Sequence, residues 1–261
     1  MTTHPVRAKK HLGQHFLNDP DAAVSIVDAL TGHGGYDNVL EIGPGTGVLS
    51  DLLFGSGRFE VYLIDIDAES IAFLEKTYPA KTDHIIEGDF LALDPDEYFK
   101  GDFAVIGNFP YNISSQILFR VLDLRDRVPE VVGMFQKEVA ERIASGPGNR
   151  DYGILSVFMQ AYYDVELLFT LDQHAFVPPP KVKSGVIRCR RKIGFELTCD
   201  RKLFVKVVKA AFNQRRKTLR NALSVLLPKD KMEGLPFLDL RAEALHWSSF
   251  AELTEAIATR I

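Results

Sequence analysis

The tetrapeptide Asn108-Phe109-Pro110-Tyr111 follows an apolar run that ends at Ile106-Gly107. It therefore lies where a buried strand gives way to a loop. The asparagine offers a side-chain carbonyl, the proline stiffens the turn, and the tyrosine offers a flat ring. Such groups could hold the exocyclic amine of a base while the ring covers the face of that base. Asn-x-Pro-Tyr also occurs in ordinary turns, so other motifs must decide its meaning.

A glycine-rich segment, Glu41-Ile42-Gly43-Pro44-Gly45-Thr46-Gly47, lies upstream between an apolar run and a helical pattern. Glycines at such a place allow a tight turn and a close approach of the backbone to a ligand. The spacing is G-x-G-x-G, whereas a dinucleotide fingerprint is G-x-G-x-x-G. Glu41 would also serve a pyrophosphate poorly, but a ligand with a sulfonium and an ammonium group would tolerate it. These two features argue against an NAD-linked dehydrogenase.

Two further carboxylates close the next candidate strands. Asp65 ends the second strand about 20 residues after the glycines, where it can accept hydrogen bonds from both hydroxyls of a ribose. Asp89 ends the third strand and offers a carboxylate to the amine of adenine, with Phe90 beside it to cover the ring. Each feature alone also occurs as a helix cap. Their order at successive strand ends is the layout of an S-adenosylmethionine-dependent methyltransferase.

Alternating apolar runs and helical patterns must position these residues, and they predict a mostly parallel sheet covered on both faces. We therefore expect an α/β, Rossmann-like, seven-stranded class I methyltransferase fold. The expected strands are Val39–Gly43, Val61–Asp65, His84–Glu87, Phe103–Asn108, Val131–Gln136, Val165–Thr170 and Gly185–Arg190. The expected helices are Ala22–Leu30, Gly47–Phe54, Ala68–Thr77, Ser114–Leu124, Lys137–Ala144 and Ile154–Tyr163. Only a Pro-rich loop joins the last two strands, so we expect them to pair antiparallel at an edge.

The pattern changes beyond Arg191. We expect residues 201–227 to form a basic amphipathic helix broken near Asn213, and residues 240–261 to form further short helices. Pro228 and the segment 234–236 are breakers. The sequence thus predicts a catalytic domain at residues 1–193 and a small helical domain at residues 194–261.

The bulk composition is that of a globular protein of 261 residues, with 46% hydrophobic and 25% charged residues. Met1 to Lys10 are polar and basic without an apolar segment, so no secretory signal is expected, and no apolar run is long enough to span a membrane. Cys189 and Cys199 lack histidine partners at ligand spacing. We therefore expect reduced thiols in a cytoplasmic protein, and neither a metal nor a disulfide framework.

The net charge of −4 conceals a strong asymmetry. Residues 181–220 carry 14 Lys and Arg against two acidic residues, whereas residues 1–180 carry 13 basic and 27 acidic residues. A basic segment in an otherwise acidic chain indicates a polyanionic partner. The alternative is the solvated face of a helix.

Four blocks resemble a known family, the rRNA adenine dimethyltransferases. Lys10–Asn18 resembles their N-terminal K-x-x-G-Q-N-F-L signature, and Phe135–Arg142 resembles their QKEV-x-x-R block. Phe176–Val182 and Phe212–Thr218 match two later blocks. The resemblance covers almost the whole chain, from Lys9 to about Leu223.

The resemblance implies S-adenosylmethionine as cofactor, and three positions depart from the commonest bacterial pattern. His15 replaces the usual Asn, Asp65 is one methylene shorter than Glu, and Phe109 stands where Leu or Pro is usual. The charge that His15 acquires near pH 6.5 would matter beside a cationic cofactor. The expected cofactor-binding residues, with those of the glycine segment, are His15, Leu17, Glu41, Gly43, Gly45, Asp65, Asp89 and Asn108.

The resemblance also implies dimethylation of the N6 amine of two adjacent adenines in a hairpin loop near the 3′ end of 16S rRNA in the small ribosomal subunit. We expect two carbonyls, from the Asn108 side chain and the Phe109 backbone, to accept the amine N–H bonds, because they stabilise the charge that develops there. The expected catalytic set is Asn108, Phe109, Pro110, Tyr111 and Phe176, with the two last as platforms for the base. The resemblance makes the helical domain at residues 194–261 the expected rRNA-binding domain. The expected RNA-binding cations are Lys181, Lys183, Arg215, Arg216, Lys217 and Arg220.

Two other functions stay open from the sequence. One is an adenine N6-methyltransferase that acts on large-subunit rRNA, against which the block at residues 212–218 argues. The other is a non-catalytic ribosome-assembly factor on the same fold, against which the intact Asn108, Pro110 and Tyr111 argue. We further expect a monomer with a role in ribosome biogenesis.

Overall fold

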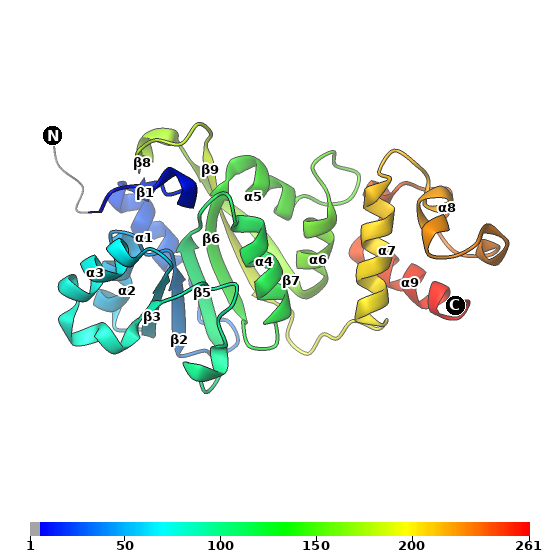
Figure 1. Ribbon diagram of the computed structural model, residues 1–261. Coiled ribbons are helices and arrows are strands. Elements are labelled where there is room, and N and C mark those ends of the chain that lie inside the picture. Colours follow the sequence, from blue (N-terminus) through cyan, green and yellow to red (C-terminus); the bar gives the residue numbers. More distant parts are fainter. Residues whose placement is uncertain (1–5) are drawn as a thin grey trace. The chain divides into compact units, whose positions relative to one another are not determined.

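The computed structural model describes residues 6–261, and a seven-stranded sheet forms its centre (Figure 1). The strands are β2 (Asn38–Ile42), β3 (Glu60–Asp65), β4 (Ile85–Glu87), β5 (Phe103–Asn108), β6 (Glu130–Gln136), β7 (Tyr163–Leu171) and β9 (Ser184–Arg191). They are arranged in the order β4-β3-β2-β5-β6-β9-β7. Neighbouring strands from β4 to β6 pair in parallel. The expected fold class and all seven expected strands are confirmed.

The two last strands are neighbours at one edge of the sheet, as expected. β7 lies at the edge with β9 as its neighbour, but β9 is inserted between β6 and β7. β9 runs antiparallel to β6 in a register that extends from Glu130↔Arg190 to Gln136↔Ser184. A loop rather than a crossover helix precedes β9, and this permits the reversed direction.

A second, two-stranded sheet escaped the sequence analysis. β1 (Phe16–Leu17) pairs antiparallel with β8 (Phe176–Val177), with Phe16 opposite Val177 and Leu17 opposite Phe176. Two-residue strands are too short to give a periodic pattern. This small sheet ties the N-terminal signature to the later Phe-Val-Pro block.

Helices cover both faces of the large sheet. On one face the apolar sides of α1 (Pro20–Asp28), α2 (Val48–Ser56) and α3 (Ala68–Thr77) share a core with alternate residues of the central strands. α4 (Ser114–Asp123) lies on the opposite face (Figure 1) and buries Ile117, Leu118, Val121 and Leu122. Asp19 and Asp67 are the N-caps of α1 and α3, and their side chains accept backbone N–H bonds of the first turn.

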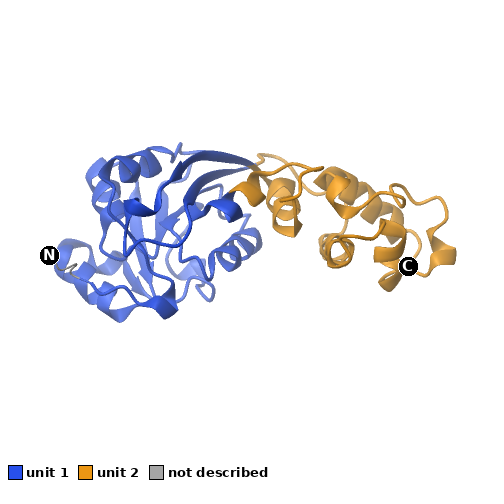
Figure 2. Cartoon of the chain, turned by 90° about the horizontal axis from the view of Figure 1, so that it is seen from above, with its two compact units in different colours: residues 1–140, 165–191 blue, residues 141–164, 192–261 orange. Residues whose placement is uncertain are grey.

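The chain divides into two compact units (Figure 2). One unit comprises the described residues up to Ala140 together with Val165–Arg191, and the other comprises Glu141–Asp164 and Lys192–Ile261. The sequence analysis placed residues 141–164 with the catalytic domain, whereas the structure groups them with the helical unit. The reason is that α6 (Ile154–Tyr162) packs against α7 (Arg201–Asn213) and α9 (Trp247–Ala258).

The helical unit is more broken than the sequence indicated. The expected break near Asn213 is confirmed, because α7 ends at that residue, but only the short α8 (Leu219–Ala222) follows it. α5 (Lys137–Ala144) leads from β6 toward this unit along the chain. The 3-10 helices are η1 (Lys10–Leu12), η2 (Pro79–His84), η3 (Pro95–Glu97), η4 (Gln173–Ala175), η5 (Leu223–Val225), η6 (Lys229–Met232) and η7 (Ala242–Ala244). No helix within residues 6–261 is long and apolar enough to cross a membrane.

Candidate active site

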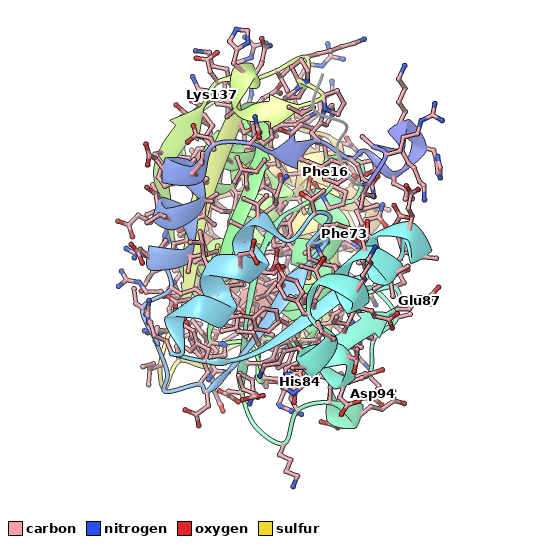
Figure 3. The ribbon with its side chains drawn as sticks, turned by 90° about the vertical axis from the view of Figure 1, so that its left-hand side faces the viewer. Phe16, Phe73, His84, Glu87, Asp94 and Lys137 are labelled. Atoms are coloured by element: carbon pink, nitrogen blue, oxygen red, sulfur yellow. The ribbon has the colours of Figure 1, made fainter. Side chains whose placement is uncertain are left out.

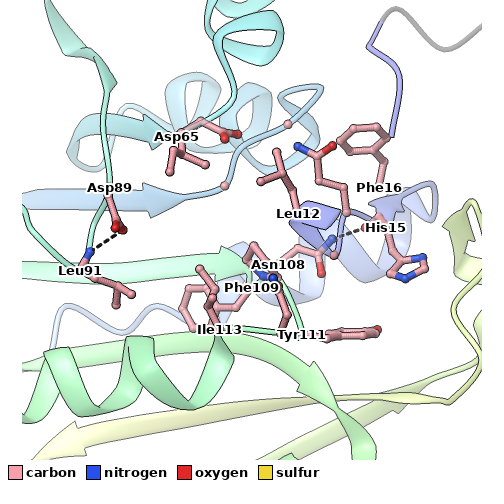
Figure 4. A pocket seen from close by; sticks show the side chains of 17 residues that line it. Leu12, His15, Phe16, Asp65, Asp89, Leu91, Asn108, Phe109, Tyr111 and Ile113 are labelled. Atoms are coloured by element: carbon pink, nitrogen blue, oxygen red, sulfur yellow. Dashed lines mark hydrogen bonds between the residues drawn. The ribbon is translucent and has the colours of Figure 1, made fainter. Parts of the chain in front are cut away.

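A pocket opens at the carboxyl ends of β2, β3 and β5 (Figure 4). Figure 3 shows Phe16 toward this end of the sheet, and His84 and Asp94 at the other end. The empty space in the pocket, including part of its opening to solvent, is about 820 Å³. The pocket is lined by most of the expected cofactor and catalytic residues, namely His15, Gly43, Gly45, Asp65, Asp89, Asn108, Phe109, Pro110 and Tyr111.

The glycine turn forms one wall of the pocket. Gly43, Gly45 and Gly47 have φ angles of 67°, 56° and 82°, a region that side chains with a Cβ rarely adopt. A Cβ on Gly45 would also lie 2.7 Å from the ring of Phe16. The turn therefore needs glycine both for its backbone and for the aromatic ring that packs on it.

Glu41 precedes this turn and is almost fully buried, with 1% of its surface exposed. The hydroxyl of Ser50 donates a hydrogen bond of 2.6 Å to it. Burial raises the pKa of Glu41 to about 8, and the carboxylates of Asp65 and Asp51 add to this rise. Glu41 and Leu17 line a smaller adjoining pocket that shares Gly43 and Asn108 with the main one.

Asp65 and Asp89 stand at the ends of neighbouring strands. Asp65 is 7% exposed, and burial raises its pKa although its Oδ1 accepts a hydrogen bond of 2.9 Å from the backbone of Asp67. Asp89 is exposed and accepts the Leu91 N–H at 2.9 Å. The expectation for Phe90 is wrong, because that ring is buried and does not line the pocket. Ile66, which is 60% exposed, supplies apolar surface instead.

These groups fit the adenosine part of S-adenosylmethionine. Asp65 presents a carboxylate that can accept the hydrogen bonds of two ribose hydroxyls. Asp89 presents a second carboxylate that can accept a bond from the adenine amine, and Ile66 and Leu91 offer apolar side chains to the flat ring. The left-handed Gly43 and Gly45 let the backbone approach the ligand closely.

The N-terminal segment closes over the pocket through contacts that the sequence analysis missed. Lys9 forms an ion pair with Asp67, and Gln14 Nε2 donates to the same carboxylate at 3.0 Å. Burial raises the pKa of Asp67, but the bonds from Lys9 and Gln14 outweigh it and hold this pKa below its usual value. More than 50 residues separate Asp67 from both partners, so no local pattern signals the contact.

Asn108 is the last residue of β5 and has a fixed orientation. Its Nδ2 donates a hydrogen bond of 2.7 Å to the backbone carbonyl of His15 (Figure 4). The side-chain carbonyl therefore remains as an acceptor at the pocket. The next backbone carbonyl, that of Phe109, supplies a second acceptor in the same loop, whereas the Pro110 carbonyl already accepts the Ile113 N–H at 3.2 Å.

Tyr111 presents a ring at the pocket and is held at both ends. Its hydroxyl lies 2.6 Å from the Oγ of Ser184, which is fully buried at the start of β9. Its ring centroid is 5.5 Å from that of His15, with the planes tilted by 30° (Figure 4). Burial raises the pKa of Tyr111, so the phenol stays neutral and can serve as a flat apolar surface.

The side chain of Phe109 anchors the loop from below, a role that the sequence did not reveal. The ring is 1% exposed and meets Phe135 edge to face, with centroids 5.2 Å apart. It occupies a slot above Gly107 and Gly133, which lie opposite each other on β5 and β6. A Cβ on Gly133 would come within 2.3 Å of this ring. The two glycines therefore leave room for the Phe109 ring, and the packing of this ring fixes the loop after β5.

Phe176 does not line the pocket. Its ring is 2% exposed and belongs to the core beneath α1 and α2. A stacking role for Phe176 on a base would require the ring to leave that core. Within residues 6–261, no cluster of three or more His, Cys, Asp or Glu side chains could hold a metal ion.

The expected RNA-binding cations differ in their surroundings. Lys183 pairs with Asp172 at 3.0 Å in the catalytic unit, where Lys181 is also exposed. In the helical unit the Nε of Arg215 donates to Glu243 at 2.7 Å, and Arg220 pairs with Asp239 at 3.2 Å. The remaining two, Arg216 and Lys217, are exposed.

Comparison with known proteins identifies the family. A family model described as ribosomal RNA adenine dimethylase matches residues 6–257 of this chain. The chain belongs to the ribosomal RNA adenine dimethylase family. It is therefore an rRNA adenine dimethyltransferase, and its methyl donor is S-adenosylmethionine, as the sequence predicted.

Individual relatives of this dimethylase cover nearly its full length. Ribosomal RNA small subunit methyltransferase A of Cytophaga hutchinsonii is 56% identical over 97% of this chain and 98% of the relative. The protein of the same name from Flavobacterium johnsoniae is 53% identical over 97% of this chain and 96% of the relative. A crystal structure of a dimethyladenosine transferase from Plasmodium falciparum matches with a TM-score of 0.80 and 26% identity, over 94% of this chain and 98% of that one. The 23S rRNA methyltransferase ErmE shares the fold, with a TM-score of 0.69 and 22% identity over 93% and 99% of the two chains.

Proposed function

We propose that this dimethylase transfers methyl groups from S-adenosylmethionine to the N6 amines of two adjacent adenines in a hairpin loop near the 3′ end of 16S rRNA. Its substrate is the small ribosomal subunit, and it acts as a cytoplasmic monomer with a role in ribosome biogenesis. The names of its relatives from Cytophaga and Flavobacterium support the choice of the small subunit. The observation that carries the chemistry is the pair of carbonyl acceptors in the loop after β5.

The adenine amine is a weak nucleophile because its lone pair is conjugated with the ring. When its two N–H bonds are directed to the carbonyls of Asn108 and Phe109, the nitrogen is favoured in a pyramidal form with its lone pair free. The same carbonyls stabilise the positive charge that grows on nitrogen during attack. The hydrogen bond from Asn108 Nδ2 to His15 matters here, because it keeps the amide from presenting its donor to the amine.

The cofactor supplies an electrophilic methyl group, and the remaining task of the protein is positioning. Tyr111 offers a surface on which the flipped base can stack, and Pro110 keeps the loop rigid. The product nitrogen is an acidic ammonium, so no strong general base is required. After the first transfer one N–H remains, and one of the two carbonyls suffices to orient the amine for the second.

The proposed cofactor contacts follow the strand ends. Asp65 would hold the ribose, Asp89 the adenine amine, and Gly43 and Gly45 the part of the ligand that passes the turn. The buried Glu41 lies on the side of the glycine turn where a cationic ammonium would be tolerated. The segment that contains His15 and Leu17 would cover the ligand, because it is anchored through Asp67 and through β8.

The test is methyl transfer from labelled S-adenosylmethionine to small subunits that lack the modification, followed by nucleoside analysis. We expect N6,N6-dimethyladenosine with the wild type, and a loss in kcat of about 100- to 1,000-fold with Asn108→Ala, the range for removal of one group that stabilises charge in the transition state. Asn18→Ala is the control, because Asn18 is exposed and does not line the pocket. It should retain wild-type activity.

Purified large subunits, offered in the same assay, decide the main rival. Methylation of large but not small subunits by the wild type would refute the proposed substrate. Tight binding to small subunits with no methyl transfer by the wild type would instead leave a ribosome-assembly factor. Full activity of Asn108→Ala would reject the assigned role of that carbonyl while leaving the substrate intact.

A further inference from the structure

The cations of the helical unit fall into two groups. Arg215 and Arg220, which the sequence singled out for RNA, hold acidic partners within their own unit. Lys202, Lys206 and Lys209 of α7 are exposed, and no carboxylate within the described residues forms an ion pair with any of them. These three lysines of α7 are therefore available to an outside partner, as are the exposed Arg216 and Lys217 that follow the helix.

The three lysines lie on one side of the helix. Since successive residues are about 100° apart around an α-helix, positions 202, 206 and 209 fall within a sector of about 60°. The opposite side of α7 is buried and carries Phe204, Val207, Val208, Ala210 and Ala211. α7 is packed within its unit against α6, α8 and α9, so the lysine side is the one that faces away from the core of the unit.

This arrangement is unfavourable for the isolated protein. Lys202–Lys206 and Lys206–Lys209 are like-charge pairs at spacings of four and three residues, which destabilise a helix. Lys202 also lies in the first turn, where the helix dipole disfavours a cation. α7 contains no acidic residue between Arg201 and Asn213 that would offset these charges. A polyanion bound along these three lysines would remove the repulsion between them.

The charge of the whole unit points the same way. The helical unit carries 15 Lys and Arg against 11 Asp and Glu, whereas the catalytic unit carries 16 against 24. The excess of positive charge therefore belongs to the unit that holds α7. Asn213 is exposed and adds a hydrogen-bonding group on the same side of the helix.

The geometry points to α7 as a contact surface for the RNA backbone, in which Lys202, Lys206 and Lys209 bind successive phosphates. This inference rests on the proposed function, because it takes rRNA as the polyanion. From Lys202 to Lys209 the helix rises about 10 Å at 1.5 Å per residue, a length that spans a few nucleotides of one strand. Contacts of this kind add affinity without reading sequence.

The test compares the triple variant Lys202→Gln/Lys206→Gln/Lys209→Gln with a control that removes the same number of charges, Lys229→Gln/Lys231→Gln/Arg241→Gln. All six positions are exposed in the same unit. Binding of the full-length proteins to unmodified small ribosomal subunits is measured by filter binding between about 50 and 200 mM salt. We expect the α7 variant to lose about tenfold or more in affinity, with a log–log salt dependence shallower by about 2 to 3. The control should change by less than about threefold.

The kinetic prediction separates RNA contact from damage to the site. At saturating subunits, the α7 variant should keep kcat, because none of its lysines lines the pocket, while its KM for subunits rises. Equal losses in the two triple variants would reduce the effect to general charge and overturn the inference, as would an unchanged salt dependence of the α7 variant. If the wild type itself neither binds nor methylates small subunits, the proposed function fails. That result differs from one in which the wild type is active and only the RNA contact of the α7 lysines is refuted.

Discussion

The two ends of the pocket are built from different kinds of group. The cofactor end is acidic and partly buried, with Glu41 and Asp65 at the strand ends and Asp67 behind them. The acceptor end carries no charged side chain in the tetrapeptide from Asn108 to Tyr111, and neighbours fix it by packing and by neutral hydrogen bonds. Charge therefore dominates one end and shape the other.

This difference predicts different sensitivities. A buried carboxylate changes its ionisation with pH, so the cofactor end should respond to pH. A close-packed ring over two glycines leaves no room for an added methyl group, so the acceptor end should respond to volume. The comparison is tested by a substitution at the acceptor end that changes volume but not charge, and by one at the cofactor end that changes charge but hardly changes volume.

The largest effect is expected from an added methyl group under the catalytic loop. Gly133→Ala places a Cβ 2.3 Å from the Phe109 ring and 2.8 Å from the Phe135 ring. The loop must move to relieve this overlap, and a shift of about 1 Å at a reacting group can cost about 100-fold in rate. We expect a fall of that size in kcat for methyl transfer, together with about 1–3 kcal/mol of lost stability from overpacking.

A smaller side chain at position 109 should rescue this variant. In Gly133→Ala/Phe109→Leu the shorter side chain leaves space for the new methyl group, so kcat should recover at least tenfold over the single variant. Phe109→Leu alone provides the reference for the loss of the ring. Gly133→Ala with wild-type kcat and a wild-type melting temperature would show that Phe109 does not fix the loop.

At the cofactor end the expected effect is one of pH. The pKa of Glu41 rises on folding from 4.5 to about 8, so the folded protein holds a proton there that the unfolded chain releases. The free energy of unfolding should therefore decrease as pH rises from about 5 to 8. Glu41→Gln lacks this titration. Its free energy of unfolding should therefore increase by about 2–4 kcal/mol relative to that of the wild type as pH rises from 5 to 8. Urea unfolding at pH 5 and at pH 8, without cofactor, measures this free energy for both proteins.

Glu87→Gln supplies the matched control for this experiment. Glu87 ends the neighbouring strand β4, and its side chain is exposed. Its replacement should alter the free energy of unfolding by a similar small amount at both pH values. A difference between wild type and Glu41→Gln that stays constant from pH 5 to 8 would contradict a buried, protonated Glu41.

The cofactor end was the more predictable from sequence. Glu41, Gly43, Asp65 and Asp89 each follow an apolar run, and parallel strands bring their carboxyl ends to one edge of a sheet. The pattern of runs thus predicted both the sheet and these positions. The misassignment of Phe90 has a simple reason: the ring turns into the core, and the sequence gives no sign of the direction of a side chain after a strand.

The acceptor end was predictable only in part. The identity of Asn108 and Tyr111 indicated chemistry, but the residues that hold them are distant in sequence. Ser184 is 73 residues from Tyr111, and the carbonyl of His15 is 93 residues from Asn108. The sequence analysis assigned no role to Gly107 and Gly133, whereas the structure shows that they accommodate Phe109. Tertiary contacts of this kind leave no periodic pattern in the chain.

The smallest expected effect distinguishes orientation from mere presence of the Tyr111 ring. Ser184→Ala and Tyr111→Phe each remove one side of the 2.6 Å hydrogen bond and leave the ring in place. A neutral hydrogen bond contributes about 0.5–1.5 kcal/mol, so we expect KM for small subunits to rise about threefold to tenfold with kcat nearly unchanged. The double variant should be no worse than either single one, because both act through the same bond. Additive losses in this cycle would mean that Ser184 affects the acceptor end by a route other than Tyr111, and that the ring is held by packing alone.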